Sequence, residues 1–366
     1  MKRKRILVNA YFAQNLGDDL FLKVLFDRYP NVEFHLLTAN EKYKIVFQNY
    51  RNVKIIKTLS VKIGNRTVNL FNKVHDCIVK YRNYNAFVNI GGSIFMESVG
   101  WEKGLKSRRH LPEKFKKVNK NTYIIGANFG PFEDDLFMRK HKEFFASFDD
   151  ICFRDNYSYT IFGDLENVRF APDVVFSLKS KYSAIPGNNR VIGFSIIDVE
   201  KRKGLKHYFY KYIEKMSEII KNYIDLGYKI KLFSFCEKEG DLRAINFLLK
   251  NMESQYAKQV AVVSYSVNIN KFLDEYKTCE TVIGTRFHSI ILSLLFNQNI
   301  FPIIYSDKSY NVLRDINMES NCCFIKDIEE LDVKKVIKDS LDNKLANRSL
   351  MLESEEQFRK LDLLLV

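Results

Sequence analysis

Arg286 and His288 stand two positions apart in the segment 284–289, which reads GTRFHS and lies between two apolar runs. A guanidinium binds phosphate or carboxylate through paired hydrogen bonds, and an imidazole gives or takes a proton near neutral pH. A strand that ends in glycine before a helix also presents N–H groups that favour an anion. The segment predicts an anion-binding site with a proton-transfer group, although His288 as a helix-capping or core residue is the alternative.

Polar and glycine-rich residues follow other apolar runs of strand length. They are Asn15, Gly17 and Asp18 after the run 6–10, Gly91, Gly92 and Ser93 after 86–90, Asn128 after 122–127, and Arg154 after 150–153. Asp18 either caps the helix that it opens or acts as an acid–base group, and Asp19 is expected to be structural. For Arg154, a surface ion pair is the alternative to binding a ligand.

Strand-length apolar runs alternate with helix-period segments along the whole chain. This alternation predicts parallel sheets covered by helices on both faces. A polar, turn-rich stretch at 176–190 indicates a domain boundary. We expect Rossmann-like domains at 1–180 and 181–327, followed by helices at 328–366 that pack back across them. In such folds, ligands bind at the carboxyl ends of the strands, by default in the cleft between two domains.

Composition excludes several classes of protein. Of 366 residues, 46% are hydrophobic and 28% charged, which is typical of a folded globular chain and excludes a disordered one. No apolar run reaches the roughly 20 residues of a membrane span, and no signal peptide is evident, so we expect a cytoplasmic protein. The six cysteines (77, 152, 236, 279, 322 and 323) form no C-x-x-C pair, and neither a disulfide framework nor a metal site is expected.

Basic residues outnumber acidic ones, 58 against 44, for a formal net charge of +14. Small basic clusters lie at 103–109, 114–120 and 201–206. Such an excess fits nucleic acid, an anionic membrane surface or an anionic substrate. Because no nucleic-acid-binding motif accompanies the clusters, we expect no nucleic-acid partner.

Seven short motifs, taken in order, resemble the polysaccharide pyruvyl transferase family. They are N-x-G-D at 15–18, G-G at 91–92, G-x-x-x-G-P at 126–131, R-D-x-x-S at 154–158, A-P-D at 171–173, G-T-R-x-H-S at 284–289 and P-x-x-Y-x-x-K at 302–308. The resemblance runs from about residue 6 to about residue 315. It implies a glycosyltransferase-B-like fold in which two Rossmann-like domains face a cleft.

Members of that family transfer the enolpyruvyl unit of phosphoenolpyruvate (PEP) onto two sugar hydroxyls, giving a pyruvate ketal and phosphate. The resemblance implies that Arg286 and His288 bind PEP, with Arg154 as a further basic position. Lys308 and Ser289 complete the expected donor site, with His288 as acid or phosphate ligand and Asp18 as the base. Asn15, Gly17, Gly91, Gly92, Ser93 and Asn128 are expected to line the acceptor side. No metal or redox cofactor is required; PEP is a co-substrate.

The expected acceptor is a hexose that becomes a 4,6-ketal, with galactose favoured, on an undecaprenyl-diphosphate-linked oligosaccharide for capsule or exopolysaccharide synthesis. The basic charge fits a protein that visits the anionic inner leaflet of the membrane. One alternative is a nucleotide-sugar glycosyltransferase of the same fold, in which Glu237 or Glu239 holds a ribose. Another is a non-catalytic scaffold of a polysaccharide assembly complex.

Overall fold

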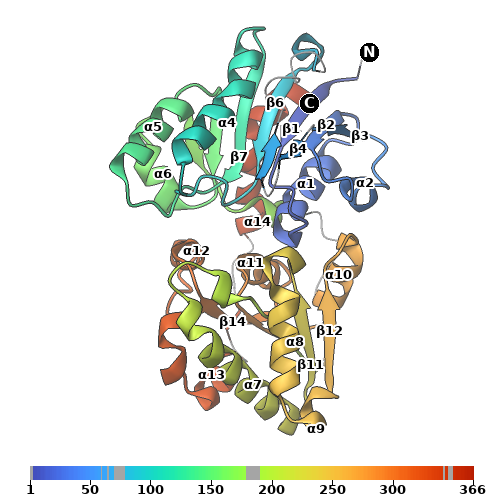
Figure 1. Cartoon of the computed structure of the whole chain (residues 1–366), viewed down its shortest axis with the longest axis vertical. Coiled ribbons are helices and arrows are strands. Elements are labelled where there is room, and N and C mark those ends of the chain that lie inside the picture. Colours follow the sequence, from blue (N-terminus) through green and yellow to red (C-terminus); the bar gives the residue numbers. More distant parts are fainter. Residues whose placement is uncertain are drawn as a thin grey trace. The chain divides into compact units, whose positions relative to one another are not determined.

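The computed structural model describes residues 3–58, 60–63, 66–69, 79–178, 190–340, 343–344 and 349–366. Most of the predicted boundary, 179–189, lies outside them, as does Cys77, and the other five cysteines are free thiols. The chain forms two compact units. The first comprises Met1–Phe12, Phe21–Ser177 and Leu352–Val366, and the second comprises Ala13–Leu20 and Leu178–Met351 (Figure 1).

The first unit contains a seven-stranded parallel sheet of order β3-β2-β1-β6-β7-β8-β9. Its strands are β1 (Arg5–Asn9), β2 (Glu33–Thr38), β3 (Val53–Lys57), β6 (Ala86–Ile90), β7 (Asn121–Ala127), β8 (Asp150–Phe153) and β9 (Val168–Phe170). A separate antiparallel pair joins β4 (Ser60–Ile63) to β5 (Arg66–Asn69). Every residue of the central strand β6 is buried, as expected for a parallel strand covered on both faces.

Helices cover this sheet. They are α1 (Leu16–Arg28), whose first turn belongs to the second unit, α2 (Tyr43–Val46), α4 (Trp101–Lys116), α5 (Asp135–Phe145), α6 (Asn156–Phe162) and α15 (Arg359–Leu365), with short 3₁₀ turns at Tyr81–Asn83, Val174–Ser177 and Glu355–Phe358. Polar caps fix where two of them begin. Asp134 accepts from the N–H of Leu136 at the start of α5, and Asp155 accepts from Ser158 at the start of α6.

The second unit contains a six-stranded parallel sheet of order β12-β11-β10-β13-β14-β15. Its strands are β10 (Val191–Ser195), β11 (Lys229–Ser234), β12 (Val260–Ser264), β13 (Thr281–Gly284), β14 (Asn299–Ile304) and β15 (Cys323–Phe324). The sequence prediction of two parallel α/β domains is therefore confirmed. In neither unit do the described residues include a helix with the length and apolar character that crossing a bilayer requires.

The helices of the second unit are α7 (Phe209–Asp225), α8 (Asp241–Asn251), α9 (Ser254–Ala257), α10 (Ile269–Tyr276), α11 (Phe287–Leu295), α12 (Asp307–Asp315) and α13 (Val333–Ser340), with 3₁₀ turns at Val199–Lys201, Lys206–Tyr208, Glu237–Glu239 and Ile325–Glu330. Helix α14 (Ser349–Ser354) spans the point where the chain passes from the second unit to the first. Helix α11 is apolar on all sides and all but one of its residues are buried, so it lies inside the unit and is held rigidly.

Each unit includes a segment that is distant in sequence from the rest of it. In the second unit, the N–H of Leu16 donates to the carbonyl of Phe235 at 3.0 Å. In the first unit, the buried side chain of Gln357 accepts from the N–H of Gly126 at 3.0 Å and donates to the carbonyl of Ala171 at 2.7 Å. The tail that the sequence analysis treated as one segment, 328–366, is thus divided, with α13 in the second unit and α15 in the first.

Candidate functional site

The segment 284–289 joins the end of β13 to the start of α11, as the sequence predicts. Arg286 is the N-cap residue of α11 and has extended backbone angles. The hydroxyl of Ser289 donates to the carbonyl of Arg286 at 2.6 Å, and the N–H of Ser289 donates to the same oxygen at 2.9 Å. Ser289 is fully buried. Its observed contact therefore closes the first turn of the helix and fixes the backbone at Arg286.

The guanidinium of Arg286 is held by two carboxylates of its own unit. Its Nε donates to Asp241 Oδ2 at 2.9 Å, its Nη2 donates to the other Asp241 oxygen, and its Nη1 donates to Glu239 Oε2 at 2.5 Å. Burial by itself lowers the pKa of Arg286, but these two carboxylates outweigh burial and hold the pKa well above its ordinary value. The paired donors expected to bind a ligand are therefore engaged by Asp241.

Glu239 connects Arg286 to the N-terminal motif. Its Oε1 accepts from the side-chain amide of Asn15 at 3.0 Å, and its Oε2 also accepts from Arg202 at 2.6 Å. Burial raises the pKa of Glu239, but Arg286 and Arg202 lower it more, and the net pKa lies well below its usual range. The side-chain oxygen Oδ1 of Asn15 in turn accepts from the backbone N–H of Gly17 at 3.0 Å.

Gly17 and His288 are packed against each other. A Cβ atom placed on Gly17 would lie 1.8 Å from His288 Nδ1, a separation that real Cβ contacts do not show. Only glycine therefore admits the imidazole at this position. Asp18 follows directly and is partly buried in the first turn of α1. The neighbouring Asp19 is fully buried and accepts from the Tyr265 hydroxyl at 2.6 Å, which agrees with its expected structural role.

Two further cations lie around Tyr305, which follows β14. The Nζ of Lys308, on the first turn of α12, is 5.7 Å from the centre of the Tyr305 ring and 5.9 Å from that of Phe287. The guanidinium carbon of Arg202 is 5.6 Å from the Tyr305 ring centre. Sequence reasoning named Lys308 but not Arg202 or Tyr305 as site residues, although Arg202 lies in a basic cluster and Tyr305 in one of the seven motifs.

A second cluster forms in the first unit around Arg154, which is 3% exposed. Its Nη1 donates to Asp173 at 2.9 Å, and its Nη2 donates to Asn128 Oδ1 at 2.7 Å and to Ser93 Oγ at 3.4 Å. A Cβ on Gly92 would lie 2.6 Å from Cζ of Arg154, so this glycine gives the guanidinium its space. Arg154 therefore forms a buried ion pair with Asp173, and not the surface ion pair that the sequence analysis gave as the alternative.

The predicted residues thus fall into two groups. Asn15, Gly17, Arg286, His288 and Lys308 lie at the carboxyl ends of strands in the second unit, joined by Arg202, Glu239, Asp241 and Tyr305. Gly92, Ser93, Asn128 and Arg154 come together in the first unit, joined by Asp173, while Gly91 precedes them with a φ of 145° that favours glycine. Among the described residues, no cluster of three His, Cys, Asp or Glu side chains is arranged to hold a metal ion.

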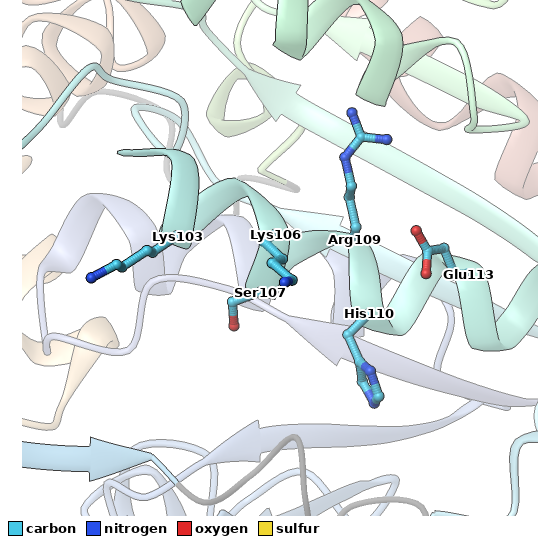
Figure 2. Close-up of a pocket in the computed structure, with 6 residues that line it drawn as sticks. All are labelled: Lys103, Lys106, Ser107, Arg109, His110 and Glu113. Carbon is cyan, nitrogen blue, oxygen red and sulfur yellow. The ribbon is translucent and has the colours of Figure 1, made fainter. Parts of the chain in front are cut away.

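A cavity of about 590 Å³ lies beside α4 in the first unit and is lined by none of the predicted site residues. Figure 2 shows its lining side chains, which are Lys103, Lys106, Ser107, Arg109, His110 and Glu113. Ser107 and His110 project from the same side of the helix in this view. Three permanent cations against one carboxylate make this surface strongly basic, so it favours anionic groups.

Two parallel α/β units of this kind define a glycosyltransferase-B-like protein. The sequence profile of the polysaccharide pyruvyl transferase family matches residues 15–307, and the chain belongs to that family. The match includes both clusters, which agrees with the resemblance drawn from the seven motifs. It supports a transferase that acts in pyruvyl transfer.

Individual relatives are distant. The chain is 22% identical over 287 residues to the amylovoran biosynthesis protein AmsJ of Erwinia amylovora, which covers 72% of this chain and 67% of that protein. Among solved structures, the UDP-GlcNAc 2-epimerase of Methanocaldococcus jannaschii, in complex with UDP-GlcNAc and UDP, matches with a TM-score of 0.60, 11% identity and coverage of 98% and 99%. Anabaena HepE in complex with UDP matches with a TM-score of 0.57, 11% identity and 98% coverage of both chains. These structures share the fold.

Proposed function

We propose that this protein transfers the enolpyruvyl unit of PEP onto two hydroxyls of a hexose and releases phosphate. The observation that carries the proposal is the contact between Gly17 and His288 beside the Arg286 cluster. This contact brings together two family motifs from opposite ends of the chain. The imidazole belongs to the first turn of α11, a helix start that favours an anion, and it contacts the residue that precedes Asp18, the expected base.

The charges around α11 suit a small, highly charged donor. Arg286 is fixed by Asp241, so its contribution to PEP binding is a positive field rather than an open pair of donors. Lys308 and Arg202 are only partly buried, and Arg202 also donates to Glu239 at 2.6 Å. Lys308 lies near Phe287 in the N-terminal turn of α11, and Arg202 lies near Tyr305. Together the two cations provide positive charge for binding the PEP phosphate.

The reaction needs two additions to the same carbon. A proton is delivered to the methylene carbon C3 of PEP while the first sugar hydroxyl bonds to C2 and loses its proton to a base. The C2–O bond to phosphate then breaks, and its electron pair leaves with the phosphate. The second hydroxyl bonds to C2 and completes the ketal. We assign the base to Asp18 and the donor-side acid or phosphate ligand to His288.

We further propose that the acceptor is a hexose, galactose in particular, that becomes a 4,6-ketal on an undecaprenyl-diphosphate-linked oligosaccharide at the inner face of the membrane. The name of the relative AmsJ supports a role in polysaccharide synthesis. The basic surface beside α4 supports contact with an anionic leaflet.

Vesicle binding tests the membrane part of this proposal. The wild type should sediment with vesicles that contain phosphatidylglycerol at low salt and detach at high salt. Replacement of Lys103 and Lys106 by Gln should weaken binding on the order of tenfold, since each cation near an anionic surface contributes about 1 kcal/mol. Replacement of the exposed Lys258 and Lys326 by Gln provides the matched control. Equal binding by both double variants contradicts docking through α4.

The glycosyltransferase alternative is favoured by the UDP complexes of the structural relatives, but not by Glu239. That carboxylate already accepts from Arg286, Arg202 and Asn15, so both of its oxygens are engaged. The scaffold alternative gives no reason for a buried glycine to admit an imidazole beside an anion site. Pyruvyl transfer accounts both for the engagement of Glu239 by other side chains and for the contact between Gly17 and His288.

Thermal unfolding in the presence of PEP or UDP-sugars tests the donor without knowledge of the acceptor. A ligand at 100 times its Kd stabilises the folded state by about 2.7 kcal/mol, which is visible as a higher Tm. PEP should raise the Tm of the wild type and of the control Lys258→Met, but not that of Lys308→Met. Lys308→Met is preferred to Arg286→Ala, because the latter strips Asp241 of its partner. A shift with UDP-sugars alone overturns the proposal.

A further inference from the structure

We propose that Tyr305 is a catalytic residue of this site, whose phenol hydroxyl donates the proton that the departing phosphate takes up. The inference rests on the proposed function and names a residue to which neither the family motifs nor the sequence chemistry gave a role. Its basis is the arrangement of charges around one ring. Tyr305 directly follows β14, and Ser306 separates it from the start of α12.

Cations approach Tyr305 from two separate elements. Arg202 reaches it from the turn that follows β10, at 5.6 Å from the ring centre, and Lys308 reaches it from α12 at 5.7 Å. Because both cations lie close to the same ring, the proposal puts the phosphate of the ligand beside the tyrosine. Attraction between a cation and the face of an aromatic ring holds this arrangement in place without using the hydroxyl.

The hydroxyl is left available by this packing. Other tyrosines buried in the second unit donate or accept through their hydroxyls, as Tyr276 does to the carbonyl of Ser289 at 2.7 Å. Within the described ranges, Tyr305 makes only ring contacts, and its side chain is partly exposed. A phenol that has no hydrogen-bond partner among the described residues and lies close to two cations is suited to an anionic ligand.

The surrounding charges also make this phenol a better acid. Burial raises the pKa of Tyr305, but Lys308, Arg286 and Arg202 together outweigh burial and the opposing charge of Glu239, and the net pKa is lowered. These four groups come from α12, the N-cap of α11, the turn after β10 and the turn before α8. The same cations stabilise the phenolate that remains after proton donation.

The step balances as follows. The C2–O bond of the phosphorylated intermediate breaks and its electron pair goes to the phosphate oxygen. The Tyr305 O–H bond breaks, and its proton bonds to that oxygen. As the second sugar hydroxyl bonds to C2, its proton passes to the Tyr305 phenolate. The phosphate departs with the proton of the tyrosine, and the proton of the second hydroxyl replaces it, so the residue is restored.

The variant Tyr305→Phe removes the hydroxyl and keeps the ring between its cations. The matched control is Tyr210→Phe, at a tyrosine of the same unit that is 67% exposed. Binding of inorganic phosphate, followed by calorimetry, should weaken at least tenfold in Tyr305→Phe and remain unchanged in the control. An ultraviolet pH titration should also lose its lowest-pH tyrosine ionisation in Tyr305→Phe alone. Unchanged phosphate affinity together with an unchanged titration overturns the proposal.

Kinetics separate a catalytic role from a binding role. With PEP and a galactoside as acceptor, Tyr305→Phe should release phosphate at least 100-fold more slowly than the wild type at saturating PEP. A rate within fivefold of wild type overturns the assignment even if binding is weakened. The failure of the proposed function has a different signature, because the wild type itself would then show no stabilisation by PEP.

Discussion

The two buried arginines contributed by the family motifs are held in different ways. Arg154 in the first unit donates to the carboxylate of Asp173 and to the neutral acceptors Asn128 and Ser93. Arg286 in the second unit has two carboxylates, but Arg202 shares one of them and Lys308 stands nearby. That cluster therefore keeps one cation in excess. The difference indicates that Arg154 stabilises the fold of the first unit, whereas Arg286 fixes the local structure beside which other cations contact a ligand.

Arg154→Met should produce the largest loss of stability. The substitution leaves Asp173 fully buried without its counter-ion, and removal of one member of a buried ion pair costs about 3–5 kcal/mol. Urea unfolding measures this free energy, and Arg139→Met on the exposed side of α5 is the control. A loss below about 1 kcal/mol would show that Arg154 does not stabilise the first unit through this ion pair.

Gly17→Ala should abolish the Tm shift with PEP and lower the free energy of unfolding by about 1–3 kcal/mol, because the new methyl group overlaps His288. The control is Gly104→Ala in α4, where a Cβ meets nothing within 4 Å. Alanine favours a helix over glycine by about 1 kcal/mol, so this control should be neutral or stabilising. A Gly17→Ala protein that responds normally to PEP would remove His288 from the site.

The two units can also be compared through the effect of their histidines on the pH dependence of stability. Burial among aromatic rings lowers the pKa of His141, in the first unit, from 6.5 to about 4. Below pH 6.5, the unfolded chain binds a proton that the folded state does not, so stability should fall by about 3 kcal/mol as the pH drops toward 4.

His141→Phe should flatten that pH dependence, as measured by urea unfolding at several pH values. His207→Asn, at an exposed position, should leave it unchanged. If His141→Phe keeps the full slope, other groups in the molecule are responsible for it.

Arg202→Gln should have the smallest effect on stability. Arg202 is partly exposed, and Glu239 retains Arg286 and Asn15 as partners, so a loss below about 1 kcal/mol is expected. The same variant should nevertheless weaken PEP binding, because it removes a positive charge from beside Tyr305 and the expected phosphate site. A large loss of stability would place Arg202 with Arg154 and Arg286 as a structural residue.

The strand-and-helix alternation was sufficient to predict both sheets, because central strands such as β6 and β10 are continuous apolar runs. Three edge strands were missed, whereas the edge strand β12 was expected from the apolar run at 259–263. The strand β3 is partly exposed, and β9 and β15 contain only three and two residues, so they carry little periodic signal.

Site residues were predicted better than their partners. Glycine, arginine and histidine at strand ends are visible in sequence, but the binding of Arg286 by Asp241 depends on tertiary packing that brings the first residue of α8 to the N-cap of α11. Asp241 reads as an ordinary first residue of a helix, and Arg202 as one of several lysines and arginines in a loop. Only the tertiary structure distinguishes a buried counter-ion from a helix cap.

The contacts of Gln357 have a consequence for the order in which the chain folds during synthesis. This residue binds the backbone of β7 and of the segment after β9, so the first unit lacks part of its interior until the segment that contains Gln357 leaves the ribosome. The second unit is complete once Met351 has emerged. Most of the first unit is translated early, but its sequence is completed only after that of the second unit. The unit that contains Arg286 and His288 is therefore the first to have its whole sequence available for folding.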